Sequence, residues 1–191
     1  MLRRGAHIRE PHGIYFLTFT IVGWADLFTR QQCRTIIIDA LRHCKISKGL
    51  LLYGYVIMSN HMHLIAATRK ESEGMSVFIR DFKKFTARQL IEWFKTSKQE
   101  SRKEWVTAIL GQYGTANPAN ETYQVWSNDN HPVLIYSPKF ARQKLNYIHM
   151  NPVKAGIVDS PEDYIYSSAR NYAGRRDYIL EVEMLDLIFM E

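Results

Sequence analysis

Two histidines separated by one residue, His61 and His63, have the side chains and the spacing to do chemistry. Side chains alternate between the two faces of a strand, so both imidazoles point to one face and Met62 points to the other. Two imidazoles on one face make half of a metal site. Because buried histidines often serve only the structure, the pair needs partners from elsewhere in the chain.

A second pair, Tyr147 and Asn151, is predicted to share one face of a helix, because residues four apart lie one turn from each other. A phenol can act as a nucleophile, and an amide oxygen can complete a metal site that two histidines begin. Taken alone, Tyr147 reads as one of eleven tyrosines in a core or interface, and Asn151 as a helix end before Pro152. His149 points away from Tyr147 on such a helix.

The elements that must position these residues predict an α+β domain. Strands are expected at residues 14–22, 51–58 and 61–68, with short strands at 124–126 and 132–136. Helices are expected at residues 30–48, 76–95, 103–110, 137–150 and 182–189. The order strand, helix, strand, strand, helix, strand resembles a ferredoxin-like split βαβ unit with an antiparallel sheet. In that unit the histidine strand is central, and a later helix can cover its face.

Three residues mark predicted helix ends. Thr29 is expected to cap the helix 30–48, and Gly49 to stop it. Pro152 is expected to break the helix that carries Tyr147.

The length of 191 residues, 46% of them hydrophobic, fits a single domain 1–191 with a core of about 8–158 and a tail of 159–191. The longest apolar stretch, 15–24, is too short to span a membrane, and no signal peptide is evident, so a cytoplasmic protein is expected. Cys33 and Cys44 would lie roughly 16 Å apart along one helix, too far for a disulfide, so both are expected in the core.

The net charge of +6 favours a polyanionic partner such as nucleic acid. The helix predicted at 76–95 is basic and amphipathic, which makes it a candidate DNA-binding element. Its candidate contacts are Arg80, Lys83, Lys84 and Arg88. Interleaved aromatic residues could stack bases, although core packing explains most of them.

Three ordered motifs, at residues 55–65, 147–158 and 161–169, resemble the REP-associated tyrosine transposases of the HUH single-tyrosine superfamily. The resemblance covers roughly residues 8–170. It implies that His61, His63 and Asn151 bind one divalent cation, Mg²⁺ or Mn²⁺, and that Tyr147 is the nucleophile on a C-terminal helix. The implied substrate is single-stranded or hairpin DNA, cleaved through a 5′-phosphotyrosine by a monomer or homodimer. His131 is a candidate neighbour of this site.

Two other functions compete with this interpretation. Metal hydrolases with an HxH motif usually continue with an acidic residue and a further histidine, but here Leu64, Ile65 and Ala66 follow. The second alternative is a non-catalytic DNA-binding protein that retains the transposase fold. The intact set of His61, His63, Tyr147 and Asn151 argues against it.

Overall fold

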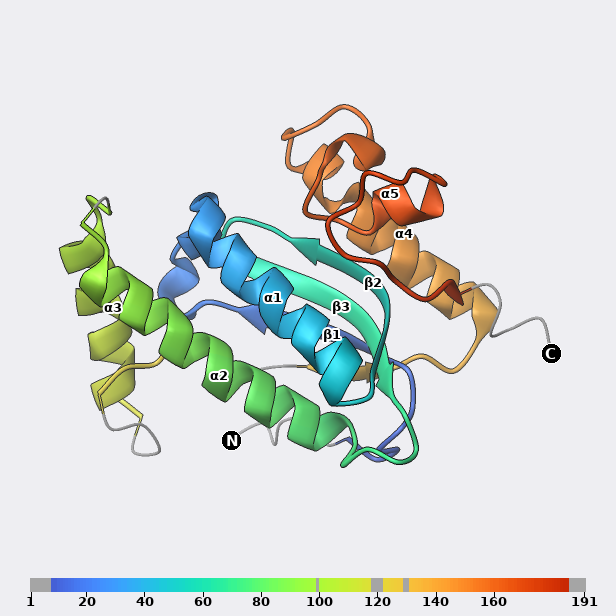
Figure 1. The fold of residues 1–191 in the computed structure, drawn as a ribbon, viewed down its shortest axis with the longest axis horizontal. Coiled ribbons are helices and arrows are strands. Elements are labelled where there is room, and N and C mark those ends of the chain that lie inside the picture. Colours follow the sequence, from blue (N-terminus) through green and yellow to red (C-terminus); the bar gives the residue numbers. More distant parts are fainter. Residues whose placement is uncertain (1–7, 99, 118–121, 129–130, 186–191) are drawn as a thin grey trace, which may run out of the picture.

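The computed structural model describes residues 8–98, 100–117, 122–128 and 131–185. Its sheet is antiparallel, with the strand order β2-β3-β1-β4 (Figure 1). The strands are β1 (Tyr15–Thr20), β2 (Leu50–Ile57), β3 (His61–Thr68) and β4 (Val133–Leu134). The predicted α+β class and the central place of the histidine strand are therefore confirmed.

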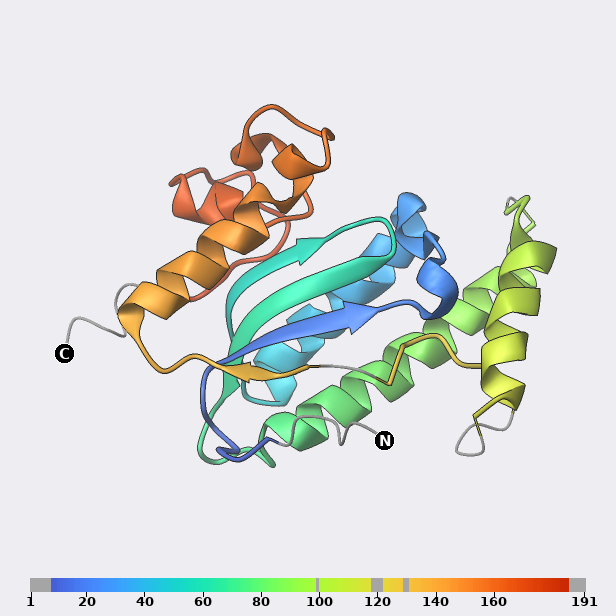
Figure 2. The same ribbon diagram turned by 180° about the vertical axis from the view of Figure 1, so that it is seen from behind.

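Helices cover the two faces of this sheet unequally. On one face lie α1 (Gln31–Ser47) and α2 (Met75–Thr96), with α3 (Lys103–Thr115) packed beside α2 (Figure 1). On the other side α4 (Pro138–Lys154) packs on β2 and β3 (Figure 2). Short helical turns are η1 (Val22–Trp24), η2 (Leu27–Thr29), η3 (Pro161–Asp163) and α5 (Ala169–Tyr172).

The alternation of side chains along the strands divides the buried residues into two clusters. Leu17 and Phe19 of β1 point into the larger cluster, with α1 and α2. Phe16, which directly precedes Leu17 in the chain, points into the smaller cluster with Ile148 of α4. On β3, Met62 and Leu64 join the larger cluster, so His61 and His63 face the side of α4.

The cap predicted at Thr29 is wrong. Residues 27–29 form the 3₁₀ turn η2, in which the Thr29 hydroxyl donates to the Asp26 carbonyl at 2.8 Å. Helix α1 therefore begins only at Gln31, after Arg30, whose side chain caps nothing. The predicted stop is confirmed, because Gly49 follows the last residues of α1 with a φ of 68°.

The break predicted at Pro152 is also wrong, because α4 continues to Lys154. Pro152 lies in the last turn, where the missing N–H removes a single bond of the helix, and its ring is buried. The Ala155 N–H still donates to the Asn151 carbonyl at 3.0 Å. Asn151 consequently lies within the helix.

Some other predicted boundaries change. The helix predicted at 103–110 extends to Thr115, and the strand predicted at 132–136 is reduced to β4. Of residues 124–126, only Trp126 forms an isolated bridge, with Ile21. In the helix predicted at 182–189, residues 182–184 are not helical, and residues 186–189 lie outside the described part. Cys33 lies in the core as predicted, whereas Cys44 is only half-buried and packs against the core.

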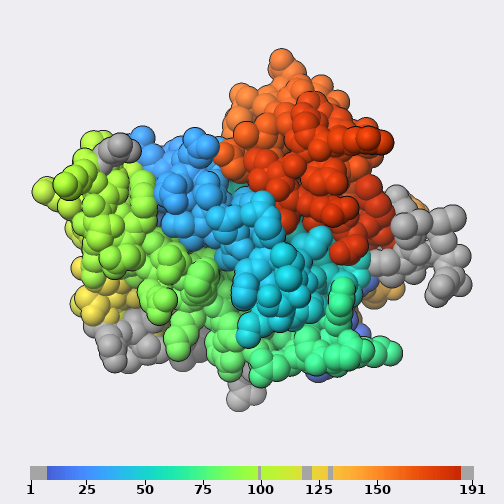
Figure 3. Space-filling model, in the orientation of Figure 1, coloured from blue at the N-terminus to red at the C-terminus, as the bar shows by residue number. Residues whose placement is uncertain are grey.

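The C-terminal segment covers the outer edge of β2, the side away from β3. Three backbone hydrogen bonds of 2.8–2.9 Å join the segment to the strand. The N–H of Ile57 donates to the Tyr166 carbonyl, that of Ser168 to the Tyr55 carbonyl, and that of Glu183 to the Leu52 carbonyl. The segment also packs against α1, whose blue and cyan atoms lie beside the red ones in Figure 3. Among the described residues, no helix is both long enough and apolar enough to cross a membrane.

Candidate active site

The two histidines of β3 lie side by side, with ring centroids 5.0 Å apart. Thr18 is the cross-strand partner of His63, and its hydroxyl oxygen is 3.0 Å from His63 Nδ1. The Asn60 side-chain oxygen accepts from His61 Nδ1 at 2.7 Å, because an amide oxygen can only accept. Holding one ring nitrogen in this way leaves Nε2 of His61 as a lone-pair donor, the arrangement found in histidine metal ligands.

Burial keeps both imidazoles neutral. His63 is 5% exposed, and burial lowers its pKa to about 3, with further lowering from His61 and Lys144. Burial also lowers the pKa of His61. Neutral imidazoles bind metals without first losing a proton.

The Nε2 atom of His63 is buried, and no hydrogen-bond partner reaches it from the described residues. Such buried polar atoms are rare, since each one loses its water without a replacement. A bound cation would supply the missing partner, so this atom fits a metal ligand. Among the described residues, no three His, Cys, Asp or Glu side chains lie close enough together to bind a metal ion. To complete a metal site, the two histidines would therefore need an amide, hydroxyl or substrate oxygen as a further ligand.

Tyr147 reaches the histidine pair from α4. Its ring centroid lies 5.3 Å from that of His63 and 5.9 Å from that of Phe16, and Phe16 in turn stacks on His63. The Tyr147 side chain is 41% exposed, so a substrate can approach it. Two motifs far apart in the sequence therefore meet across β3 and α4.

Asn151 lies one turn beyond Tyr147 on the same helix. Its side-chain N–H group donates to the Tyr147 carbonyl at 3.1 Å, and this bond leaves the amide oxygen available. Its role as the third metal ligand remains a prediction. His149 points elsewhere, as predicted: its Nε2 is 2.9 Å from the Ser168 hydroxyl, and its ring lies against Tyr172.

Two lysines flank Tyr147, and our sequence reasoning did not single them out. Lys144 Nζ lies 4.6 Å from the Phe16 ring centroid and 6.0 Å from that of Tyr147, and Lys154 Nζ is also 6.0 Å from Tyr147. Residues 144, 147, 151 and 154 are three or four positions apart, so the sequence alone could have predicted that both lysines share a helix face with Tyr147. Thr18 and Asn60 were missed as well, because their contacts with the histidines depend on strand pairing and loop shape.

The four basic residues predicted to bind DNA do not join this site. They belong to α2, on the opposite face of the sheet, where Lys83 Nζ lies 5.8 Å from the ring of Phe19 and donates to the Ser127 carbonyl. Arg80 is paired with Asp81. His131 is exposed, has a φ of 37° and precedes β4, which pairs with β1 on the side away from β3. These roles remain predictions.

The histidine pair therefore lies on a central antiparallel strand and faces a tyrosine on the helix across it. In a comparison with solved structures, the chain shares its fold with a REP-associated tyrosine transposase that was solved bound to a REP hairpin. The TM-score is 0.62 at 18% identity, and the match covers 95% of this chain and 94% of the other.

A second structure, described as a transposase from Deinococcus radiodurans, matches with a TM-score of 0.44 at 17% identity, covering 77% of this chain and 95% of the other. No protein-family model and no curated protein sequence matches the chain.

Proposed function

We propose that this protein is a metal-dependent single-stranded DNA endonuclease and strand transferase with Tyr147 as its covalent nucleophile. The observation that carries the proposal is the approach of Tyr147 to His63, with ring centroids 5.3 Å apart. A phenol beside two buried histidines in a partly open site is the kind of cluster that functional sites contain. The fold shared with a hairpin-bound transposase supports DNA as the substrate.

His61, His63 and Asn151 are the residues that would hold one Mg²⁺ or Mn²⁺ ion. When bound, the ion would polarise the scissile phosphate and offset its developing charge. The buried Nε2 of His63 and the lowered pKa values of both histidines fit this role.

In the proposed reaction the Tyr147 oxygen attacks phosphorus, and the bond from phosphorus to the 3′ oxygen breaks. The phenolic proton is lost, the departing 3′ oxygen gains one, and the products are a 5′-phosphotyrosine and a free 3′-hydroxyl. A second 3′-hydroxyl can reverse these steps, so strands are rejoined without an external energy source. The ammonium groups of Lys144 and Lys154 would stabilise the negative charge on phosphate and phenol.

The test is to mix the protein with single-stranded hairpin oligonucleotides and Mg²⁺ or Mn²⁺ and to look for a covalent adduct on a denaturing gel. We expect the adduct with the wild-type protein and none with Tyr147→Phe. Tyr136→Phe is the matched control, since Tyr136 is 76% exposed and stacks on Phe140, and it should react normally.

An adduct of normal yield with Tyr147→Phe would refute the assignment. The non-catalytic alternative makes a different prediction: the wild-type protein would bind the oligonucleotide, with an affinity that falls with salt, and would form no adduct.

A further inference from the structure

We propose that Trp24 is a stacking platform for a nucleobase next to the scissile phosphate. The inference rests on the proposed function and adds a base-binding position to it. Trp24 ends the η1 turn, which follows β1 at the edge of the histidine site.

The conformation of Trp24 is unfavourable for its residue type. Its φ is 54°, in the left-handed region that side chains with a Cβ rarely adopt, and its side chain is 70% exposed. Neither backbone preference nor core packing therefore explains a tryptophan here. Strained residues of this kind gather at ligand-binding sites, and exposed aromatic rings are the surfaces on which single-stranded DNA stacks its bases.

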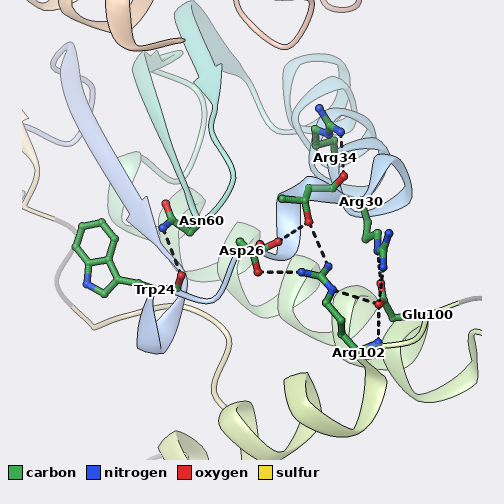
Figure 4. Close-up of polar contacts among 8 residues, drawn as sticks. Trp24, Asp26, Arg30, Arg34, Asn60, Glu100 and Arg102 are labelled. Atoms are coloured by element: carbon green, nitrogen blue, oxygen red, sulfur yellow. Dashed lines mark hydrogen bonds and ion pairs between the residues drawn. The ribbon is translucent and has the colours of Figure 1, made fainter. Parts of the chain in front are cut away.

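Trp24 is also fixed relative to the histidine site. Its ring centroid is 6.4 Å from that of His61. The Asn60 side chain connects the two residues, because its oxygen accepts from His61. Its N–H group donates to the Trp24 carbonyl at 3.3 Å (Figure 4). A base on the Trp24 ring would lie next to the phosphate that the histidines face.

An ionic network anchors the segment that directly follows Trp24. Arg102 donates to Asp26 at 2.9 Å and to the Thr29 hydroxyl at 3.2 Å (Figure 4). Glu100, whose side chain is fully buried, accepts two bonds from Arg30 and further bonds from Arg102. A rigid platform loses little conformational entropy when DNA binds.

The space beside Trp24 suits a base. An open concavity of about 390 Å³ is lined by Trp24 and by Tyr113 of α3, a second exposed aromatic residue at 42%. The amides of Asn117, Gln124 and Asn128 also line it, and no Asp or Glu is among its described lining residues. The amides bond to one another, from Asn117 to Gln124 and from Gln124 to Asn128, so the aromatic faces are the base-binding surfaces of this concavity. The lack of carboxylates avoids repulsion of phosphate.

The experiment measures DNA affinity in a Tyr147→Phe background, where cleavage does not interfere. The probe is a fluorescein-labelled hairpin oligonucleotide with single-stranded flanks, followed by anisotropy. Replacing Trp24 with Ala should weaken binding roughly ten-fold or more. Trp24→Phe should keep most of the affinity, and Trp105→Ala, which removes another half-exposed tryptophan, should bind like the parent protein.

Two further measurements separate stacking from a structural role. Abasic sites are placed at each flanking position in turn, and at one of them Trp24→Ala should cause no additional loss of affinity. Trp24→Gly should bind weakly while its melting temperature stays level or rises, because glycine adopts a positive φ without strain. A lower melting temperature with unchanged affinity would mean that Trp24 serves the fold, and the inference would be wrong.

The inference and the proposed function fail in different ways. Equal affinity of Trp24→Ala and its parent overturns the stacking role, even if wild-type protein forms the adduct. Weakened binding by Trp24→Ala without any wild-type adduct supports stacking and overturns the covalent chemistry. Absence of DNA binding by the parent protein overturns both.

Discussion

The two faces of the sheet differ in what they bury. Under α1 and α2 the face is apolar, with Phe19, Met62 and Leu64 in the larger cluster. Under α4 the cluster is smaller, and its border carries Thr18 and His63, with a ring nitrogen that no described residue satisfies. Because one face supplies most of the buried apolar surface, the other can hold polar groups that cost stability. If the two faces differ in this way, substitutions under α4 should affect the chemistry more than substitutions on α2.

The largest effect should come from removing the histidine ligands. His61→Ala, His63→Ala or a chelator should slow cleavage by at least roughly a hundred-fold, because the phosphate would lose its main electrostatic stabilisation. Single-turnover cleavage rates measure this, with recovery on adding Mg²⁺ or Mn²⁺ to the chelated wild-type protein. His43→Ala, an exposed histidine of α1, should cleave normally. Full activity of both ligand variants would contradict the metal site.

Basic residues on the two faces should differ in their effect on DNA. Lys144→Ala and Lys154→Ala should each slow cleavage about ten-fold. Each should also reduce the slope of log affinity against log salt concentration by about one, because a phosphate contact is lost. Lys84→Ala and Arg88→Ala of α2 test the earlier prediction that this helix binds DNA. We expect smaller losses from them. Equal losses on both faces would show that DNA reaches around the sheet.

Glu100 should affect stability and not chemistry. Glu100→Gln should lower the unfolding free energy by on the order of 2 kcal/mol, since Arg30 and Arg102 would lose a buried carboxylate partner. Asp81→Asn, in the exposed pair with Arg80, should change it little. Urea unfolding measures both.

The same residue predicts a pH dependence. The hydrogen bond from Arg30 lowers the pKa of Glu100 to about 2, from an ordinary value of 4.5. The stabilisation is therefore complete above pH 4.5 and is lost as the pH falls towards 2. Urea unfolding of wild type and Glu100→Gln should converge over this interval, and a constant difference would contradict the assignment.

The smallest effect compares two glycines. A Cβ on Gly54 of β2 would lie 2.9 Å from Leu145 Cδ1 of α4, so Gly54→Ala should lower the unfolding free energy by roughly 1 kcal/mol. At Gly111 of α3 a Cβ meets only ordinary contacts, at 3.7 Å or more, and Gly111→Ala should stabilise the helix by a similar amount. Opposite shifts in thermal melting are expected. A neutral Gly54→Ala would mean that α4 packs loosely.

Much of the fold was predictable because local patterns determine it. Apolar periodicity placed α2 within about a residue of its ends, and β3 begins and ends where predicted. The meeting of His63 with Tyr147 could be anticipated only through the resemblance to a known family, since no local rule connects two motifs so far apart. Helix ends were harder to predict from the sequence. The η2 turn and the presence of Pro152 in the last turn of α4 both depend on neighbouring structure.

The parts of the site that were missed depend on tertiary structure. The basic residues of α2 lie on whichever side of the sheet the helix covers, and the sequence pattern does not predict that side. The pattern predicts only that these residues share one side of the helix. Lys144 and Lys154 flank the site only because α4 packs on β2 and β3, and the sequence pattern does not predict this packing. Trp24 lies two residues beyond the strand predicted at 14–22, and only the structure reveals its positive φ.

The C-terminal segment has a consequence for any shortened version of this protein. A chain cut after Val158 would keep both histidines, Tyr147 and Asn151, and so would look catalytically complete. It would lose Tyr166, Ser168 and Glu183 along the outer side of β2, together with buried Leu180 and Val182. The bare strand edge could then pair with the same edge of another molecule, so aggregation would limit such a fragment before its chemistry did.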